Sequence, residues 1–379
     1  MYSVIQEIEK LRGGAPADVQ ETPFNRYTVL CREHDRTKTA YCFGIPIRTP
    51  SNDTLVDLRF HHSGRESTFA GTEATVSVAD SLCLMNRYGQ CDIALPGRIA
   101  KKAQDVIDIE DATRRTEIRP TPNGVLLTMN QPGATPMPCL TLRMNRTFPS
   151  VCTNGKYFAV MREKHIPFVT VSCLGVLNAG GKITAPCEVR YEKKNDSEYV
   201  LLFSGAGKGT SRMAVEINLQ ETKLFQDTTV ESGHPEMNNA FGGVSFLGNT
   251  DHFGEQWLYA RLVMADLPQL RNGHVLKAVL HIPNMGLHTK PLTVHRVAKR
   301  FCSFRSDWQN KIPPTDKVAV STASGGYYHL DMTKLLGNFR EKSENYVIRA
   351  NPTDKPVVIP TGDSFYAPQI LEVKFQTLY

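Results

Sequence analysis

Residues 198–219 read EYVLLFSGAGKGTSRMAVEINL, and this stretch decides the fold class. The letters GAGKGT at 205–210 resemble a phosphate-binding loop, in which glycines wrap the phosphates and the following helix directs its amides at the anion. Apolar residues alternate after this motif, however, at Met213, Val215, Ile217 and Leu219. A period of two is that of a strand, so no helix dipole is available to hold phosphate. We therefore expect a glycine-rich hairpin loop and not a nucleotide-binding enzyme.

The same alternation recurs along most of the chain. It is clear in TVSVADSLCLM at residues 75–85 and in CLTLRM at residues 139–144, and turn formers such as Pro122-Asn123-Gly124 separate the apolar runs. Helical candidates are few and short, namely residues 3–12, 98–106 and 332–338. Closely spaced strands without intervening helices are typical of antiparallel sandwiches. We predict an all-β protein of two antiparallel β-sandwich, jelly-roll-like domains with a short N-terminal helix.

The length of 379 residues favours two domains, because a single hydrophobic core seldom grows so large. The segment ESGHPEMNNAFGG at 231–243 is rich in turn formers, and a second strand-rich block follows it. We expect an N-terminal helix and linker over 1–24, a β-sandwich-like domain over 25–235 and a second β-sandwich over 236–379.

Composition argues against several classes of protein. The formal net charge of +6 is spread over the chain, which gives nucleic-acid binding little support. No apolar run approaches the length of a membrane span, and the N-terminus lacks the continuous apolar region of a classical secretory signal. The nine cysteines are odd in number and include no C-x-x-C pair, so we expect reduced, mostly buried thiols. Synthesis in the cytoplasm is expected, with release or assembly onto a spore, virion or cell surface.

The second half contains an ordered series of elements. They are Asp266-Leu267-Pro268 before a strand, Trp308, the segment Asp331-Met332-Thr333 with Leu335 and Leu336, and a final strand after Pro368 that carries Leu371, Val373 and Phe375. In order and spacing the series resembles the DNRLRE domain, a β-sandwich family of microbial surface proteins and of disaggregatase-type proteins that act on cell-surface polysaccharide. The resemblance covers about residues 236–379. It implies a sandwich whose surface binds polysaccharide or copies of itself.

Two functions follow as expectations. The first is a non-catalytic structural or binding protein that binds polysaccharide or self-associates, with a homo-oligomer as one form. The alternative is a polysaccharide-acting enzyme with its catalytic groups in residues 25–235 and an accessory carbohydrate-binding domain after them. No catalytic residue is assigned, because H-E-x-x-H and G-x-S-x-G are absent from the sequence and no carboxylate pair can be matched from it.

Aromatic side chains are the candidate carbohydrate-binding residues, because sugar rings stack on aromatic faces. The candidates are Trp257, Trp308, Tyr327 and Tyr328. Trp308 also suits a core or corner position, and the alternation at 327–328 predicts one buried and one exposed tyrosine.

We assign no cofactor and no metal site, because Pro283 and Pro291 prevent His281, His288 and His295 from forming a helical stripe. A structural calcium could use loop oxygens of GNTD at 248–251 or NPTD at 351–354.

Overall fold

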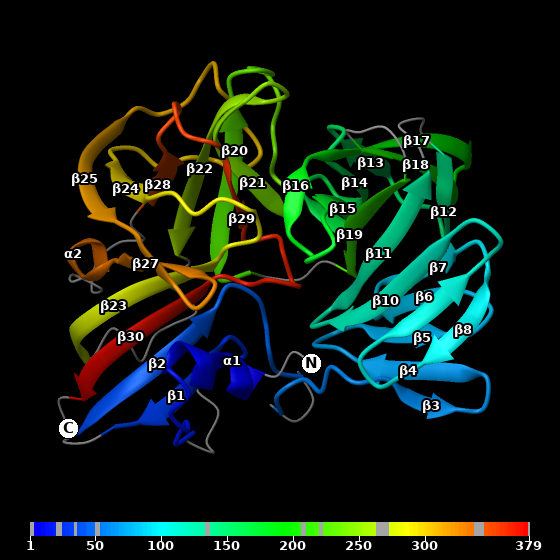
Figure 1. Ribbon diagram of the computed structural model, residues 1–379, viewed down its shortest axis with the longest axis horizontal. Helices are drawn as coiled ribbons and strands as arrows, with labels where there is room; N and C mark the ends of the chain where they lie inside the picture. The colour runs from blue at the N-terminus through cyan, green and yellow to red at the C-terminus, as the bar shows by residue number, and fades with distance from the viewer. Residues whose placement is uncertain are drawn as a thin grey trace. The chain divides into compact units, whose positions relative to one another are not determined.

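The computed structural model describes residues 4–19, 25–33, 36–49, 54–132, 137–205, 210–219, 223–262, 273–336 and 345–377. Nearly all the regular structure in these ranges is antiparallel β-sheet (Figure 1). Two short helices accompany the strands, α1 (Val4–Leu11) and α2 (Thr333–Leu336). The predicted all-β fold with a short N-terminal helix is confirmed.

The chain divides into two compact units, and the division differs from the expected one. Unit 1 comprises Val56–Glu221, and unit 2 comprises Tyr2–Leu55 together with Thr222–Tyr379. Residues 25–55 therefore belong with the C-terminal part of the chain and not with the domain expected over 25–235. The second boundary lies after Glu221 instead of near residue 235. In sequence, unit 1 is an insertion within unit 2.

Unit 1 contains two antiparallel sheets. The order of the nine-stranded sheet is β13 (Ser150–Thr153), β14 (Tyr157–Glu163), β15 (Ile166–Leu177), β19 (Thr210–Leu219), β11 (Gly124–Pro132), β10 (Arg115–Thr121), β9 (Ile107–Glu110) and β8 (Arg98–Lys102), with β16 (Ile183–Ala185) also paired to β15. The order of the eight-stranded sheet is β17 (Cys187–Asn195), β18 (Glu198–Gly205), β12 (Met137–Met144), β7 (Gly89–Ala94), β6 (Leu82–Asn86), β5 (Thr75–Val78), β4 (Glu66–Ala70) and β3 (His61–Ser63).

Aromatic rings connect the two sheets of unit 1. The ring of Phe158 on β14 has its centroid 5.0 Å from that of Tyr191 on β17 and 5.4 Å from that of Tyr199 on β18. The apolar residues that alternate along β5 and β6, from Val76 to Leu84, are buried as predicted. One expected helix is wrong: residues 98–102 form the edge strand β8.

The segment after GAGKGT is strand β19 and not a helix. Residues 210–219 are a strand hydrogen-bonded to β11 and β15, which confirms the period-two prediction. The expected hairpin is wrong, because β18 and β19 lie in different sheets; residues 206–209 between them lie outside the described residues. The alternate positions Ala214, Glu216 and Asn218 are buried as well, so neither face of this strand is turned to water.

Unit 2 also contains two antiparallel sheets. The order of the six-stranded sheet is β1 (Thr28–Arg32), β2 (Thr37–Phe43), β30 (Ile370–Thr377), β23 (Gly273–Pro283), β27 (Tyr327–Asp331) and β26 (Thr322–Ser324). The order of the seven-stranded sheet is β25 (Pro314–Val320), β24 (Leu292–Val297), β28 (Asn345–Ala350), β22 (Gly254–Leu262), β21 (Val244–Thr250) and β29 (Val357–Pro360), with β20 (Phe225–Glu231) also paired to β22.

The central strands of unit 2 follow the order of an eight-stranded jelly roll. One sheet contributes β2-β30-β23-β27, and the other contributes β22-β28-β24-β25. Side chains from both sheets share one core, in which Leu280 and Leu371 of the first sheet pack with Leu258 and Ile348 of the second. Unit 2 is therefore a β-sandwich, and it needs the N-terminal strands β1 and β2 to be complete.

Both helices cover apolar positions of unit 2. Val4 and Ile8 of α1 pack with Tyr41, Phe43 and Ile370 on the outer face of the six-stranded sheet, the face opposite the core. Two glycines with positive φ, Gly13 and Gly14, follow helix α1 and end it.

Helix α2 confirms the expectation for its segment. The backbone amide of Thr333 donates a hydrogen bond of 3.0 Å to the Asp331 carboxylate, and Leu335 and Leu336 are buried in the core. Asp266-Leu267-Pro268 and residues 337–338 lie outside the described residues.

Gly124 offers a test of the β11–β19 pairing. A Cβ at this position would overlap the backbone carbonyl oxygen of Ile217 on β19. We expect Gly124→Ala to lower the free energy of unfolding of unit 1 by about 1–3 kcal/mol, the usual cost of overpacking. Gly180→Ala is the control, because the nearest atom to its Cβ would be 3.5 Å away. Equal shifts of the urea midpoint in the two variants would contradict this packing.

Candidate functional site

The structure separates the four predicted aromatic residues into two places. Trp257 on β22 and Trp308 in the 298–313 connection lie together on the outer face of the seven-stranded sheet, with ring centroids 5.1 Å apart. Tyr327 and Tyr328 lie on β27 in the other sheet. Both tyrosines are buried, so the expectation that one is exposed is wrong. The core of the sandwich encloses Tyr328, and the ammonium group of Lys10 on α1 lies 4.8 Å from the ring of Tyr327.

The tryptophan pair is covered by two cations. The Arg349 guanidinium lies 4.2 Å from the ring of Trp257, and the Lys311 ammonium lies 4.2 Å from the ring of Trp308. The Glu255 carboxylate accepts hydrogen bonds from the indole Nε1 of Trp257 (2.6 Å) and from Arg349 (3.2 Å). Only 7% of Trp257 is exposed, and Trp308 is half-buried. Trp257 is thus a buried support for Arg349 and not an open stacking platform.

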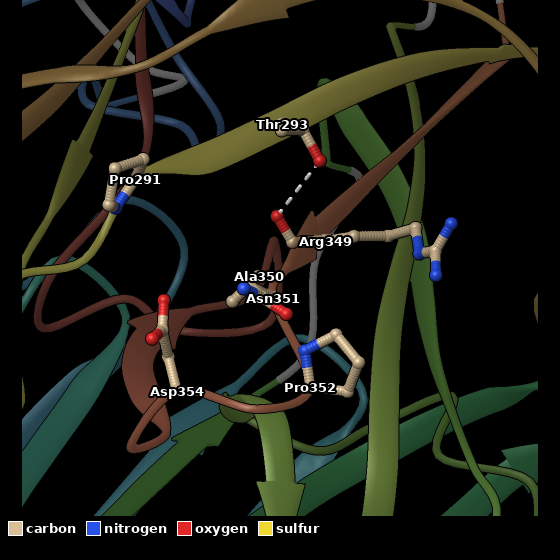
Figure 2. Close-up of a pocket in the computed structure, with 7 residues that line it drawn as sticks. All are labelled: Pro291, Thr293, Arg349, Ala350, Asn351, Pro352 and Asp354. Atoms are coloured by element: carbon tan, nitrogen blue, oxygen red, sulfur yellow. Dashed lines mark hydrogen bonds between the residues drawn. The ribbon is translucent and has the colours of Figure 1, made fainter.

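A pocket of about 340 Å³ opens beside this cluster, at the end of β28 (Figure 2). Its lining residues are Pro291, Thr293, Arg349, Ala350, Asn351, Pro352 and Asp354. The hydroxyl of Thr293 on β24 donates a hydrogen bond of 3.3 Å to the backbone carbonyl of Arg349 on β28. In Figure 2 the Arg349 guanidinium points away from Asp354, in keeping with its contacts to Trp257 and Glu255.

The pocket combines hydrogen-bonding groups with apolar walls. Thr293 has a hydroxyl, Asn351 an amide and Asp354 a carboxylate, and the rings of Pro291 and Pro352 supply apolar surface. The Nε atom of Arg349 is buried and has no hydrogen-bond partner among the described residues. Such an arrangement can bind a small polar ligand with many hydroxyl groups.

Sequence reasoning missed Thr293 and Arg349. The alternation in LTVHRV and NYVIRA places Thr293 and Arg349 on the face opposite the core residues Leu292, Val294 and Ile348. This alternation could have identified them as outward-facing polar residues. Their proximity depends on the pairing of β24 with β28, which places Thr293 opposite Arg349. Strand pairing between distant segments cannot be deduced from one sequence.

The two loops proposed for calcium differ in structure: one forms a turn, and the other is mostly part of a strand. Asn351 uses its side-chain oxygen within its own turn, where it accepts hydrogen bonds from the amide and hydroxyl of Thr353. Residues 248–250 of the other loop belong to β21. Among the described residues, no group of three or more His, Cys, Asp or Glu side chains could hold a metal ion. Calcium binding stays a prediction.

The nine thiols are all free, and six of them are buried: Cys31, Cys42, Cys91, Cys139, Cys173 and Cys187. Burial raises the pKa of Cys31 to about 11 and that of Cys42 to about 12. Cys31 and Cys42 therefore stay protonated near neutral pH, and the buried thiols act as small apolar residues, as expected.

A second polar cluster lies inside unit 2. Lys223 forms an ion pair with Asp363, and the Asp227 carboxylate accepts a hydrogen bond from the amide of Gly362. Burial raises the pKa of Asp227 to about 6, against the smaller lowering effects of Lys223 and of the Gly362 hydrogen bond. Burial lowers the pKa of Lys223 to about 8. Both groups are therefore held charged at neutral pH at a cost in stability.

Comparison with known proteins adds little. No family model matches the sequence, and no curated protein matches it. A solved structure, the N-terminal domain of the Streptococcus gordonii adhesin Sgo0707, has a TM-score of 0.19 and 7% sequence identity over 96% of this chain and 95% of that chain. A likeness at this level carries no argument about fold or function. Within the described residues, no helix has the length and apolar character needed to cross a membrane.

The raised pKa of Asp227 predicts a pH-dependent stability. The folded state binds this proton more tightly than the unfolded state, so its contribution to the free energy of unfolding is present below about pH 4 and is lost as the pH rises to about 6. At about 1.4 kcal/mol per pKa unit, the loss is on the order of 3 kcal/mol.

We expect Asp227→Asn to remove this decline, as measured by urea unfolding at intervals between pH 4 and pH 6.5. Lys223 stays charged throughout this range in both states. Asp111→Asn is the control, because Asp111 is exposed and its pKa is lowered by hydrogen bonds from Thr113 and Arg114. A wild-type decline that persists in Asp227→Asn would show that this carboxyl is not the source.

Proposed function

We propose that the protein binds carbohydrate, and that the pocket at Thr293, Asn351 and Asp354 is its saccharide subsite, where the sugar is bound without being chemically changed. The observation that carries the proposal is the chemistry of this open pocket. It places a hydroxyl, an amide and a carboxylate around a volume of about 340 Å³ between two proline rings. Sugar hydroxyls both donate and accept hydrogen bonds, and sugar C–H faces pack on apolar rings, so both kinds of lining have a partner.

Its position on the sandwich supports the proposal. The pocket opens at the end of β28 and next to Arg349, whose guanidinium rests on Trp257. The contacts of the guanidinium with Trp257 and Glu255 fix the Arg349 side chain in one orientation, so this part of the pocket wall is formed before ligand arrives. Trp257 thus supports the pocket residue Arg349, and Trp308 packs against Trp257.

We also propose that residues 236–379 are a DNRLRE-like sandwich domain, whose family acts at cell-surface polysaccharide. The β-sandwich of unit 2 supports this, as do the Asp331 cap of α2 and the buried Leu335 and Leu336. The domain would include β1 and β2 in addition to the segment that carries the resemblance.

A glycan array identifies the saccharide, and tryptophan fluorescence then measures its affinity. The chain has two tryptophans, which form one cluster beside the pocket, so their emission reports on this part of the molecule alone. We expect Thr293→Ala and Asp354→Asn each to weaken binding about tenfold, the effect of losing one hydrogen bond of about 1.4 kcal/mol.

Matched controls are Thr75→Ala and Asp80→Asn, which change exposed residues of unit 1. Both are expected to bind as the unaltered protein does. The proposal is overturned if no glycan on the array binds at millimolar concentration. It is also overturned if a glycan binds equally well to the Thr293 and Asp354 variants.

A further inference from the structure

Four polar side chains form a continuous hydrogen-bonded series on the outer face of the six-stranded sheet. Ser324 Oγ lies 2.9 Å from His329 Nε2, and His329 Nδ1 lies 2.7 Å from His281 Nδ1. His281 Nε2 lies 3.0 Å from a carboxylate oxygen of Glu372. The residues come from β26, β27, β23 and β30, which are consecutive neighbours in the sheet. His281 and His329 are direct cross-strand partners.

The directions of these hydrogen bonds follow from the chemistry of the groups. A carboxylate oxygen accepts, so His281 donates through Nε2, and in the neutral tautomer that does this its Nδ1 carries a lone pair. His329 must then donate through Nδ1, which leaves its Nε2 lone pair facing the Ser324 hydroxyl. The series therefore ends on a serine whose proton points at a histidine base. This is the geometry that activates a serine nucleophile, with the base oriented by further groups.

The serine at one end of the series is exposed, as a nucleophile must be, and the histidine in the middle is buried. The His281 side chain is 6% exposed, and that of Glu372 is 26% exposed. Ser324 at the other end is exposed to solvent. Burial and the neighbouring His281 lower the pKa of His329, which keeps this ring neutral near pH 7. The backbone carbonyl of Ser324, 3.2 Å from His329 Nε2, can accept a hydrogen bond from the ring once it is protonated.

The turn after Ser324 is open. Gly325 and Gly326 both have positive φ, and nothing lies within 4 Å of the Cβ position at either residue. Neither amide donates a hydrogen bond in the described part of the chain. Two unused amides directly after a nucleophile are available to an oxyanion. The exposed position of Ser324 makes it accessible to small acyl groups.

We propose that Ser324 is a nucleophile for acyl transfer from small carboxylic esters, with His329 as its general base and with His281 and Glu372 as positioning residues. Ser324 Oγ forms a bond to the acyl carbon, and its proton passes to His329 Nε2. The bond from the acyl carbon to the ester oxygen breaks, and the leaving alcohol takes that proton. Water then attacks the acyl carbon and gives a proton to His329 Nε2. The bond from the acyl carbon to Ser324 Oγ breaks, Oγ takes that proton back, and the carboxylic acid is released. No electron transfer is involved, and the activity is independent of the saccharide pocket.

The test uses the full chain with two probes, a fluorophosphonate and p-nitrophenyl acetate. Peptide mass spectrometry is expected to locate the phosphonate on Ser324. We expect Ser324→Ala to abolish the label and to lower kcat/KM for the acetate ester at least ~100-fold, with a similar loss in His329→Ala. Ser150→Ala, an exposed serine of unit 1, is expected to leave both readouts unchanged.

His281 is tested by rescue. Asparagine can place an acceptor where His281 Nδ1 lies, so His281→Asn should retain most of the rate that His281→Ala loses. Circular dichroism and tryptophan emission verify the fold of each variant. The proposal is overturned if the folded native chain takes no label, if the label lies on another residue, or if Ser324→Ala hydrolyses the ester within twofold of the native rate. Glycan binding in Ser324→Ala reports separately on the saccharide pocket.

Discussion

The pairing of β2 with β30 is the constraint on which unit 2 depends. It runs from Thr37 opposite Gln376 to Phe43 opposite Ile370, and it joins the two ends of the chain in one sheet. Without it the core would lose Ala40 and Cys42, and α1 would lose the apolar face on which it packs. Because unit 1 lies between these strands in sequence, the loop that must close is very long, and such contacts slow folding. We infer that unit 1 can complete its own sheets before unit 2 closes.

The sandwich also determines where chemistry can occur. Apolar side chains of both sheets form the shared core, and the two candidate sites of unit 2 lie on the outer faces. The seven-stranded sheet carries Arg349 over Trp257 and the pocket beside them. The six-stranded sheet carries the series from Glu372 through the two histidines to Ser324. The series takes one side chain from each of four neighbouring strands, and strand pairing holds these side chains within hydrogen-bonding distance. The pocket combines residues of β24 and β28 with residues of the adjoining segments.

Buried charge sets a limit on the stability of unit 2. Burial raises the pKa of Asp227 and lowers that of Lys223, which favours the neutral form of each group. Their interactions, with Gly362 and with Asp363, connect β20 to the segment that follows β29. Charged groups removed from water stabilise a structure little but make alternative packings costly, because an unpaired buried charge is worse still. This cluster therefore favours one way of bringing the two segments together over others.

The sequence by itself determined the fold class and several local features. Alternation at Met213, Val215 and Ile217 was enough to predict a strand after GAGKGT, and the helical candidate over 332–338 includes α2, because strand and helix periods are local properties. Only the tertiary structure decided which strands are neighbours. It placed β18 and β19 in different sheets, moved residues 25–55 into unit 2 and buried both Tyr327 and Tyr328. It also brought Thr293 to Arg349 and His281 to His329. These outcomes depend on pairing between distant segments, for which a single sequence has no local signal.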